Sequence, residues 1–163
     1  MEFILGEATM LPFRDRSFDY VIAFQVIEHI ADDKGFVKEV FRVLKDGGKF
    51  FITTPNRSLR LKPGQKPWFP YHVREYDYSQ LNDILQHYFS EVKIFGIKGD
   101  EGVQKIELRR IKRIQKLLSI DFLGFRKIIP HKILRKFLRL GKRKDKKINF
   151  INIVFQIIQS RKI

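Results

Sequence analysis

A succession of three patterns in the first third of this 163-residue chain constrains its fold most strongly. Residues 17–24, SFDYVIAF, end in an unbroken run of β-branched and aromatic residues, which is typical of a parallel strand covered on both faces. Residues 32–45 repeat apolar side chains at helical spacing behind two aspartates that suit a helix N-terminus. Gly47 and Gly48 can end this helix in a left-handed turn before the apolar run of residues 49–54. Strand, helix and strand in this order predict a right-handed βαβ unit.

The rest of the chain predicts a loop, a short helix and two further strands. Residues 57–76 contain three of the six prolines and no periodicity, which indicates an ordered but irregular loop. Ser79 is predicted to cap a short helix that ends near His87, and residues 91–97 are predicted to form a strand. Residues 149–160 have the composition of a last strand. We therefore expect an α/β fold.

The positive charge of the chain is concentrated in one segment. The formal net charge is +15, yet residues 1–103 hold 14 basic and 15 acidic side chains, whereas residues 104–147 hold 17 and 3. Basic amphipathic helices are predicted there, with apolar stripes at residues 111–118 and 133–138. The asymmetry predicts an ordinary domain that carries a basic helical insertion before its last strand.

Length and composition limit the remaining classes of protein. One domain is expected over residues 1–163, with an α/β core in residues 1–102 and 148–163 and the basic insertion in residues 103–147. The chain contains no cysteine, and its four histidines show no metal-ligand spacing, so we predict neither disulfides nor a metal site. Its apolar runs are far shorter than the about 20 residues that cross a bilayer. A cytoplasmic location is therefore expected, with contact at the membrane periphery as a second hypothesis.

The residues that follow the two predicted parallel strands form the candidate site, because doubly wound sheets bind ligands at the carboxyl ends of their strands. Gln25, Glu28 and His29 follow the first strand, and Asn56 follows the second. One carboxylate and one imidazole do not define a mechanism, and both are equally typical of a polar helix entry exposed to water. The pattern thus predicts the place of a site without its chemistry.

Several separated motifs resemble the class I S-adenosylmethionine-dependent methyltransferases, and most closely their type 11 branch. The motifs are GEA at residues 6–8, LPFRDRSFD at 11–19, IEH at 27–29, EVFRVLKDGG at 39–48 and ITTPN at 52–56. HVREY at residues 72–76, with the predicted helix and strand that follow, extends the resemblance to residue 97. The resemblance implies S-adenosylmethionine as the cofactor and methyl transfer to a small-molecule or lipid-like acceptor.

The resemblance also implies roles for individual residues. It places five residues beside the cofactor: Glu7, Ala8, Phe24, Gln25 and His29. Glu7 would accept a hydrogen bond from the adenine amine, although the family usually has Asp at this position. It places five residues on the acceptor side: Glu28, Asn56, Tyr71, His72 and Arg74. His29 or His72 would be the catalytic general base for a hydroxyl acceptor, whereas hydrogen bonds that pin the loop are the alternative for His72 and Arg74.

Two parts of the family's cofactor site do not occur in this sequence. They are the glycine-rich loop after the family's first strand and the acidic residue after its second, while EFILGEA at residues 2–8 matches the end of the third. The resemblance therefore predicts a partial Rossmann-like sheet without its first two strands, an N-terminally truncated family member, and impaired or absent activity of the isolated chain. Residues 2–6 would either lie against residues 19–24 or be poorly placed. An apolar sheet edge at residues 18–24 predicts dimerisation or aggregation.

Three interpretations of the basic insertion stay open. Its apolar stripes can pack as a lid over the acceptor side, with the charges solvated. They can instead bind anionic lipid as a surface helix pair. The charge also fits nucleic acid, although the sequence shows no recognised reader motif. The alternative to an enzyme is therefore a non-enzymatic basic interaction module that binds anionic membrane or nucleic acid.

Overall fold

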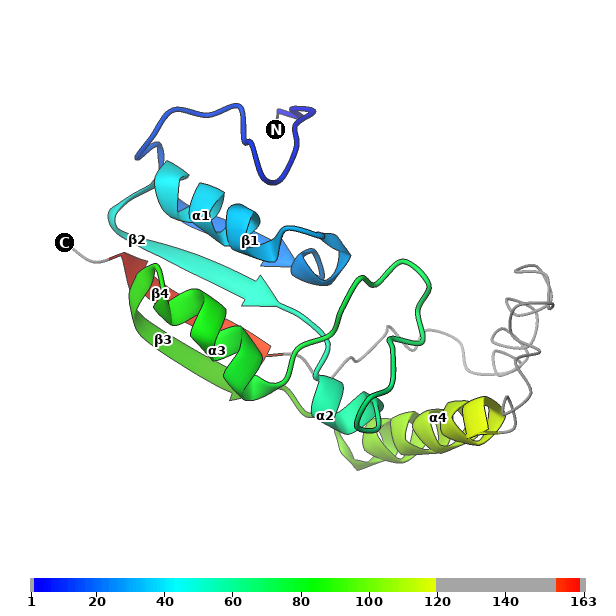
Figure 1. Cartoon of the computed structure of the whole chain (residues 1–163). Coiled ribbons are helices and arrows are strands. Elements are labelled where there is room, and N and C mark those ends of the chain that lie inside the picture. Colours follow the sequence, from blue (N-terminus) through cyan, green and yellow to red (C-terminus); the bar gives the residue numbers. More distant parts are fainter. Residues whose placement is uncertain (1, 120–154, 162–163) are drawn as a thin grey trace. The chain divides into compact units, whose positions relative to one another are not determined.

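The computed structural model describes residues 2–119 and 155–161, and the first elements form the predicted βαβ unit (Figure 1). β1 (Phe18–Phe24) pairs in parallel with β2 (Leu44–Thr53). α1 (Asp33–Val43) connects the two strands. The expected order of strand, helix and strand is confirmed.

The remaining strands complete a four-stranded mixed sheet in the order β1-β2-β4-β3. β4 (Phe155–Arg161) lies between β2 and β3 (Phe89–Gly96) and runs antiparallel to both. α2 (Arg57–Arg60) is a short helical turn within the loop that was predicted as irregular, and α3 (Tyr78–Gln86) leads into β3. The α/β class and the partial Rossmann-like sheet are confirmed.

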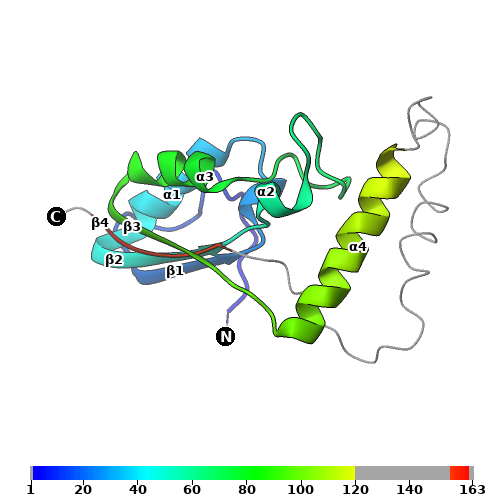
Figure 2. The same cartoon turned by 90° about the horizontal axis from the view of Figure 1, so that it is seen from below.

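The core lies between one face of the sheet and helices α1 and α3, which pack on the same side (Figure 2). Its buried side chains are Ala23, Ile27, Phe36, Val37, Val40, Leu44, Phe50, Ile52, Tyr76, Leu81, Leu85 and Phe89. Phe50 is fully buried, and its ring centroid lies 6.2 Å from that of Phe36 and 6.0 Å from that of Phe89. These aromatic contacts join β2, β3 and α1 into one apolar layer.

The opposite face of the sheet is exposed in the described residues. Tyr20, Ile22 and Phe24 of β1 are each 61% exposed, and Phe95 of β3 is 51% exposed. The prediction that β1 is covered on both faces is therefore wrong for this part of the chain. The reason is that α1 and α3 lie on one side of the sheet (Figure 2). Successive side chains of a strand point to opposite faces, so alternate side chains of β1 lie on the uncovered face.

The outer edge of β1 has no strand partner within residues 2–119 and 155–161. Glu2–Gly6 form no strand, and the side chains of Phe3 and Leu5 are exposed. Residues 2–6 were expected either to lie against β1 or to be poorly placed, and the structure shows no strand pairing for them. Dimerisation through this edge stays a prediction.

Two element ends differ from their predicted positions. α1 ends at Val43 because Leu44 already has extended backbone, so the two glycines lie inside β2 and do not end the helix. Gly47 has a φ of +75°, which only glycine adopts readily, and it lies within the irregular part of the β1–β2 register. Asp77 caps α3 in place of Ser79, because its carboxylate and the Gln80 side chain form a capping box.

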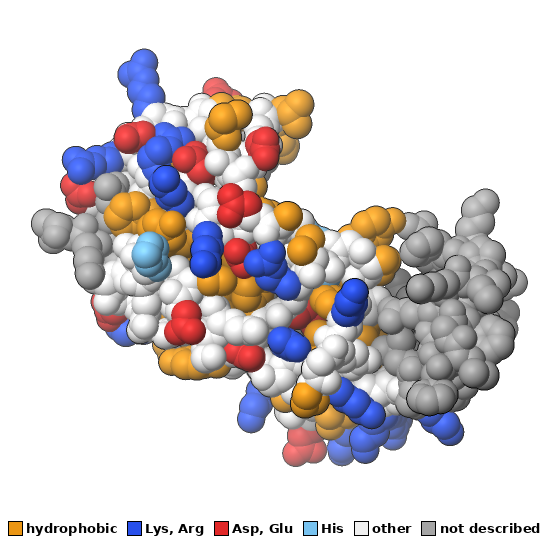
Figure 3. Space-filling view, in the orientation of Figure 1, with side chains coloured by type: hydrophobic (Ala, Val, Ile, Leu, Met, Phe, Trp, Pro, Cys, Tyr) orange, Lys and Arg blue, Asp and Glu red, His pale blue; other side chains and the backbone are white. Residues whose placement is uncertain are grey.

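The chain divides into two compact units, residues 1–98 with 152–163 and residues 99–151. α4 (Glu101–Ser119) belongs to the second unit and confirms the first predicted basic helix. Basic side chains gather over α4 in Figure 3. In the sequence of α4, four basic residues follow one another at helical spacing: Lys105, Arg109, Lys112 and Lys116. The predicted helix around residues 133–138 lies outside the described residues.

No helix in the described part of the chain is long and apolar enough to span a membrane. Peripheral contact between the basic insertion and an anionic surface stays a prediction.

Candidate functional site

Hydrogen bonds from Gln25 connect the carboxyl ends of β1 and β2. It follows β1 with a left-handed backbone (φ 56°), and its amide donates to the Thr53 carbonyl at 2.9 Å. Its Nε2 donates to Thr53 Oγ1 at 3.3 Å. The chain then turns into the 3₁₀ helix η1 (Ile27–His29), while Phe24 beside the turn stays exposed. The structure thus places Phe24, Gln25 and η1 at one end of the parallel strands.

Glu28 of η1 is completely buried, with 0% of its surface exposed. Thr54 Oγ1 donates to Glu28 Oε2 at 3.0 Å, and the Glu28 carbonyl accepts from the Val73 amide at 2.8 Å. Glu28 Oε1 has no hydrogen-bond partner among the described residues. Burial raises the pKa of the Glu28 carboxyl because the charged form loses its hydration, and the Thr54 hydrogen bond only partly opposes this.

Glu28→Gln is expected to weaken the pH dependence of stability. Above about pH 4.5, the ordinary glutamate pKa, the unfolded chain loses this proton while the folded protein still holds it. The folded state then binds more protons, so the free energy of unfolding falls as the pH rises through the raised pKa. The uncharged amide removes this loss, which urea unfolding at a series of pH values would measure.

Glu39→Gln is the matched control, because the pKa of the Glu39 carboxyl is shifted in the opposite direction. Hydrogen bonds from Arg42 lower the pKa of the Glu39 carboxyl, so its contribution to stability is present at neutral pH and is lost as the pH falls through the lowered pKa. Glu39→Gln should therefore destabilise the protein at neutral pH. An unchanged pH profile for Glu28→Gln would contradict the assignment.

His29 and His72 lie edge to face, with ring centroids 4.8 Å apart and planes at 80°. His29 Nδ1 lies 2.9 Å from the Tyr71 carbonyl oxygen, and His72 Nδ1 lies 3.0 Å from Glu75 Oε1. Carbonyl and carboxylate oxygens accept hydrogen bonds, so each Nδ1 carries the hydrogen. Each neutral ring therefore presents an unprotonated Nε2.

Glu28, His29 and His72 form what we call the strand-end cluster. A carboxylate oxygen of Glu28 and one ring nitrogen of each histidine lie within 4.8 Å of one another. No spacing in the sequence indicates this group, because His72 lies in the loop after β2 and comes close to η1 only in the fold. Two residues predicted on the acceptor side and one predicted beside the cofactor thus come together.

The other residues predicted on the acceptor side make structural contacts. Asn56 is the N-cap of α2, and its side chain accepts a backbone hydrogen bond. Arg74 donates to the Asp33 carboxylate and the Ala31 carbonyl, which are the contacts expected if it pins the loop. Tyr71 has an exposed ring. An acceptor-binding role stays a prediction for all three residues.

The segment before β1 carries the two predicted adenine contacts. Glu7 is exposed and accepts a hydrogen bond from Thr9 Oγ1 at 2.8 Å, whereas Ala8 packs against the core. Arg42 of α1 holds the following residues 11–15 through their carbonyls and the Asp15 carboxylate. The cofactor roles of these residues stay predictions.

Sequence reasoning missed Glu75 and Arg60, which support His72. Both residues are buried, and Arg60 Nη2 lies 3.4 Å from Glu75 Oε1, the oxygen that His72 Nδ1 contacts. Glu75 follows His72 by three positions, but a spacing of three indicates proximity only on a helix, and this segment is a loop. The sequence signal was therefore too weak to find them.

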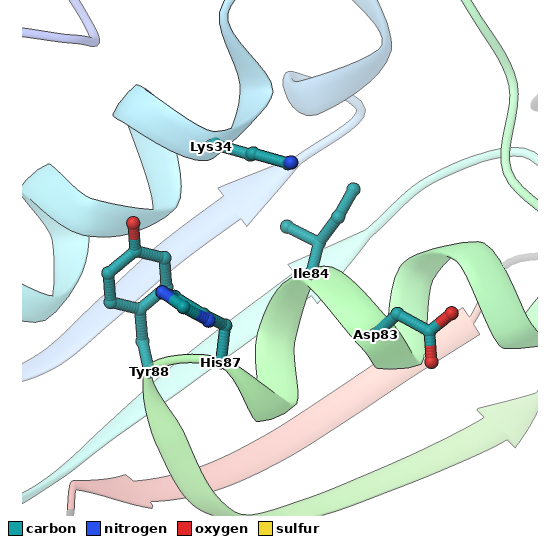
Figure 4. A pocket seen from close by; sticks show the side chains of 5 residues that line it. All are labelled: Lys34, Asp83, Ile84, His87 and Tyr88. Atoms are coloured by element: carbon teal, nitrogen blue, oxygen red, sulfur yellow. The ribbon is translucent and has the colours of Figure 1, made fainter.

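A pocket of about 210 Å³ lies between α1 and the end of α3 (Figure 4). Its lining residues are Lys34, Asp83, Ile84, His87 and Tyr88. It shares no residue with the strand-end cluster, so we assign it no part in the site.

Two kinds of sequence similarity identify the chain's relatives. Residues 1–52 match the family model of the methyltransferase domain. The "Probable S-adenosylmethionine-dependent methyltransferase" of Mycolicibacterium smegmatis is 40% identical over 106 residues, which cover 64% of this chain and 41% of that protein. A sterol 24-C-methyltransferase of Gibberella zeae is 33% identical over 106 residues, which cover 65% of this chain and 22% of that protein. The chain thus spans less than half the length of both relatives.

Solved structures share the fold at lower sequence identity. An S-adenosylmethionine-dependent methyltransferase of Thermotoga maritima gives a TM-score of 0.58 at 18% identity, covering 98% of this chain and 64% of that one. The cyclase SpnF gives a TM-score of 0.56 at 19% identity, covering 99% of this chain and 55% of that one. A cyclase with this fold shows that the fold alone does not determine the reaction. Residues 1–52 thus match the methyltransferase domain, both relatives are similar over about two thirds of this chain, and the chain shares the fold of a solved S-adenosylmethionine-dependent methyltransferase.

Proposed function

We propose that this chain forms the adenine side and the acceptor side of a site that transfers the methyl group of S-adenosylmethionine to a small-molecule or lipid-like acceptor. The match of residues 1–52 to the methyltransferase domain carries this proposal, because the matched segment contains β1 and η1. S-adenosylmethionine is the family's cofactor, and it supplies a methyl group already activated on a sulfonium.

Residues before β1 and at its carboxyl end fit this cofactor by their chemistry. Glu7 offers an exposed carboxylate that can accept a hydrogen bond from the adenine amino group. Phe24 offers exposed aromatic surface, and His29 lies at the next turn. These residues would hold one side of the cofactor.

The strand-end cluster suits proton removal from an acceptor hydroxyl. The Nδ1 hydrogens of His29 and His72 are directed to oxygen acceptors, so their Nε2 atoms can take up a proton. The buried Glu28 carboxylate would stabilise the imidazolium that results. Alignment of the acceptor and exclusion of water would supply the rest of the rate enhancement.

Aromatic side chains beside the cluster support a lipid-like acceptor. The Phe69 ring centroid lies 4.9 Å from that of His72 and 5.4 Å from that of Tyr71, and both Phe69 and Tyr71 are exposed. The sterol acceptor in the name of the G. zeae relative agrees with such a surface.

Calorimetric titration with S-adenosylhomocysteine tests the cofactor assignment. These 163 residues contain no glycine-rich strand, loop and helix, so we expect weak binding to the chain alone. Joining the chain to the preceding half-domain of the M. smegmatis relative should give saturable binding. In the joined protein, Glu7→Gln should weaken binding about tenfold because a charged acceptor is lost.

Glu2→Gln is the matched control for this titration, since Glu2 is also exposed and lies outside the GEA motif. It should leave the affinity unchanged. Absence of binding by the joined protein, with a circular dichroism spectrum that shows it folded, would contradict the proposal.

A further inference from the structure

We infer that the strand-end cluster is a binding site for a divalent transition-metal ion, with Zn²⁺ as the type case. The three proposed ligands are Glu28, His29 and His72, whose donor atoms lie within 4.8 Å of one another. Two imidazoles and a carboxylate are a common ligand set for such ions. Neither the family match nor the relatives' names assign a metal to this chain.

The hydrogen bonds of both histidines prepare them as ligands. His29 Nδ1 donates to the Tyr71 carbonyl and His72 Nδ1 donates to the Glu75 carboxylate, which leaves both Nε2 lone pairs available. These lone pairs are also the ones that would take up the acceptor's proton, so metal binding and proton removal by the histidines are alternative roles of the cluster. Metal-binding histidines in proteins make this kind of second contact, to a carbonyl or a carboxylate, because it fixes the tautomer and the ring orientation. The Arg60 guanidinium in turn holds Glu75.

The burial of Glu28 distinguishes this cluster from an ordinary polar surface. Its side chain is completely buried, and Oε1 has no hydrogen-bond partner in the described part of the chain. A buried carboxylate oxygen without a partner is costly unless a cation or a donor compensates it. Thr54 already orients the other oxygen, so the carboxylate is fixed in place.

The proposed ligands lie on two segments that are hydrogen-bonded to each other. Glu28 and His29 lie in η1, and the Val73 amide, next to His72, donates to the Glu28 carbonyl at 2.8 Å. Donor atoms in a tetrahedral zinc site lie about 3.3 Å apart, given metal–ligand distances of about 2.0–2.2 Å. Small side-chain rotations would therefore close the cluster around an ion.

The ligand set selects among metals. Mg²⁺ and Ca²⁺ prefer oxygen ligands, of which the cluster offers only those of Glu28. Imidazole nitrogens suit Zn²⁺, Co²⁺, Ni²⁺ and Fe²⁺. Three protein ligands leave a coordination position for water or an acceptor atom on the exposed side, where His29 lies.

Titration of the chelator-treated full chain with Co²⁺ tests the site without cofactor or methyl acceptor. We expect saturable visible absorption with one ion bound per chain, displaced by Zn²⁺. His29→Asn and Glu28→Gln should each weaken Co²⁺ binding at least about tenfold.

His87→Asn is the matched control, because His87 lies at the end of α3 outside the cluster and its loss should leave binding unchanged. His29 is exposed, so His29→Asn should fold, and circular dichroism checks this. The metal site would be overturned if the chain showed no saturable Co²⁺ binding. It would also be overturned if His29→Asn and Glu28→Gln bound Co²⁺ as tightly as the unsubstituted chain. Neither result would bear on cofactor binding, which the S-adenosylhomocysteine titration measures separately.

Discussion

Phe50→Ala is expected to lower the free energy of unfolding by about 3–5 kcal/mol. Phe50 is fully buried in β2, and its ring contacts those of Phe36 on α1 and Phe89 on β3. Truncation removes this apolar surface from the core and leaves a cavity that the neighbouring rings cannot fill in their preferred rotamers. Urea unfolding followed by circular dichroism would measure the loss.

Phe95→Ala is the matched control on the same sheet. Phe95 points to the exposed face and is 51% exposed, so its truncation should change the free energy of unfolding by no more than about 0.5 kcal/mol. Equal losses for the two variants would contradict the difference between the two faces.

Asp33→Ala is expected to cost about 2–3 kcal/mol of stability. Asp33 is buried, accepts the Tyr76 hydroxyl at 2.9 Å and pairs with Arg74. Without the carboxylate, the Tyr76 hydroxyl loses its acceptor inside the core and the loop that carries His72 loses a tie to α1. Unfolding in urea again gives the measurement.

Asp32→Ala separates this network from simple helix capping. The Asp32 side chain accepts from the Gly35 amide at 2.9 Å as the N-cap of α1, so its loss should cost about 1 kcal/mol. Adding Tyr76→Phe to Asp33→Ala should recover part of the loss, because it removes the unpaired hydroxyl. Equal costs for the two aspartates, with no recovery, would argue against the network.

Local patterns in the sequence predicted most secondary elements. The β-branched run of β1 and the helical spacing in α1 depend on neighbouring residues, so they can be recognised without the fold. Element ends were less certain, since Asp77 and Ser79 are both good caps and only the partner Gln80 favours the first. Coverage of the sheet could not be predicted, because an apolar run does not show which side the helices occupy.

The candidate site was predictable only in part. The strand-end rule placed Gln25, Glu28 and His29 together, because the carboxyl end of a parallel strand is a local feature. The resemblance added His72, but no pattern indicated that its ring meets that of His29. That contact depends on how the loop folds back on η1.

The sequence by itself determined the βαβ unit, the resemblance to methyltransferases and the strand end at which polar residues gather, because each depends on short, contiguous motifs. The tertiary structure alone decided the burial of Glu28, the pairing of His29 with His72 and the support of His72 by Glu75 and Arg60. The physical reason is that burial and ligand geometry arise from contacts between segments distant in the chain, which packing against a shared core brings together.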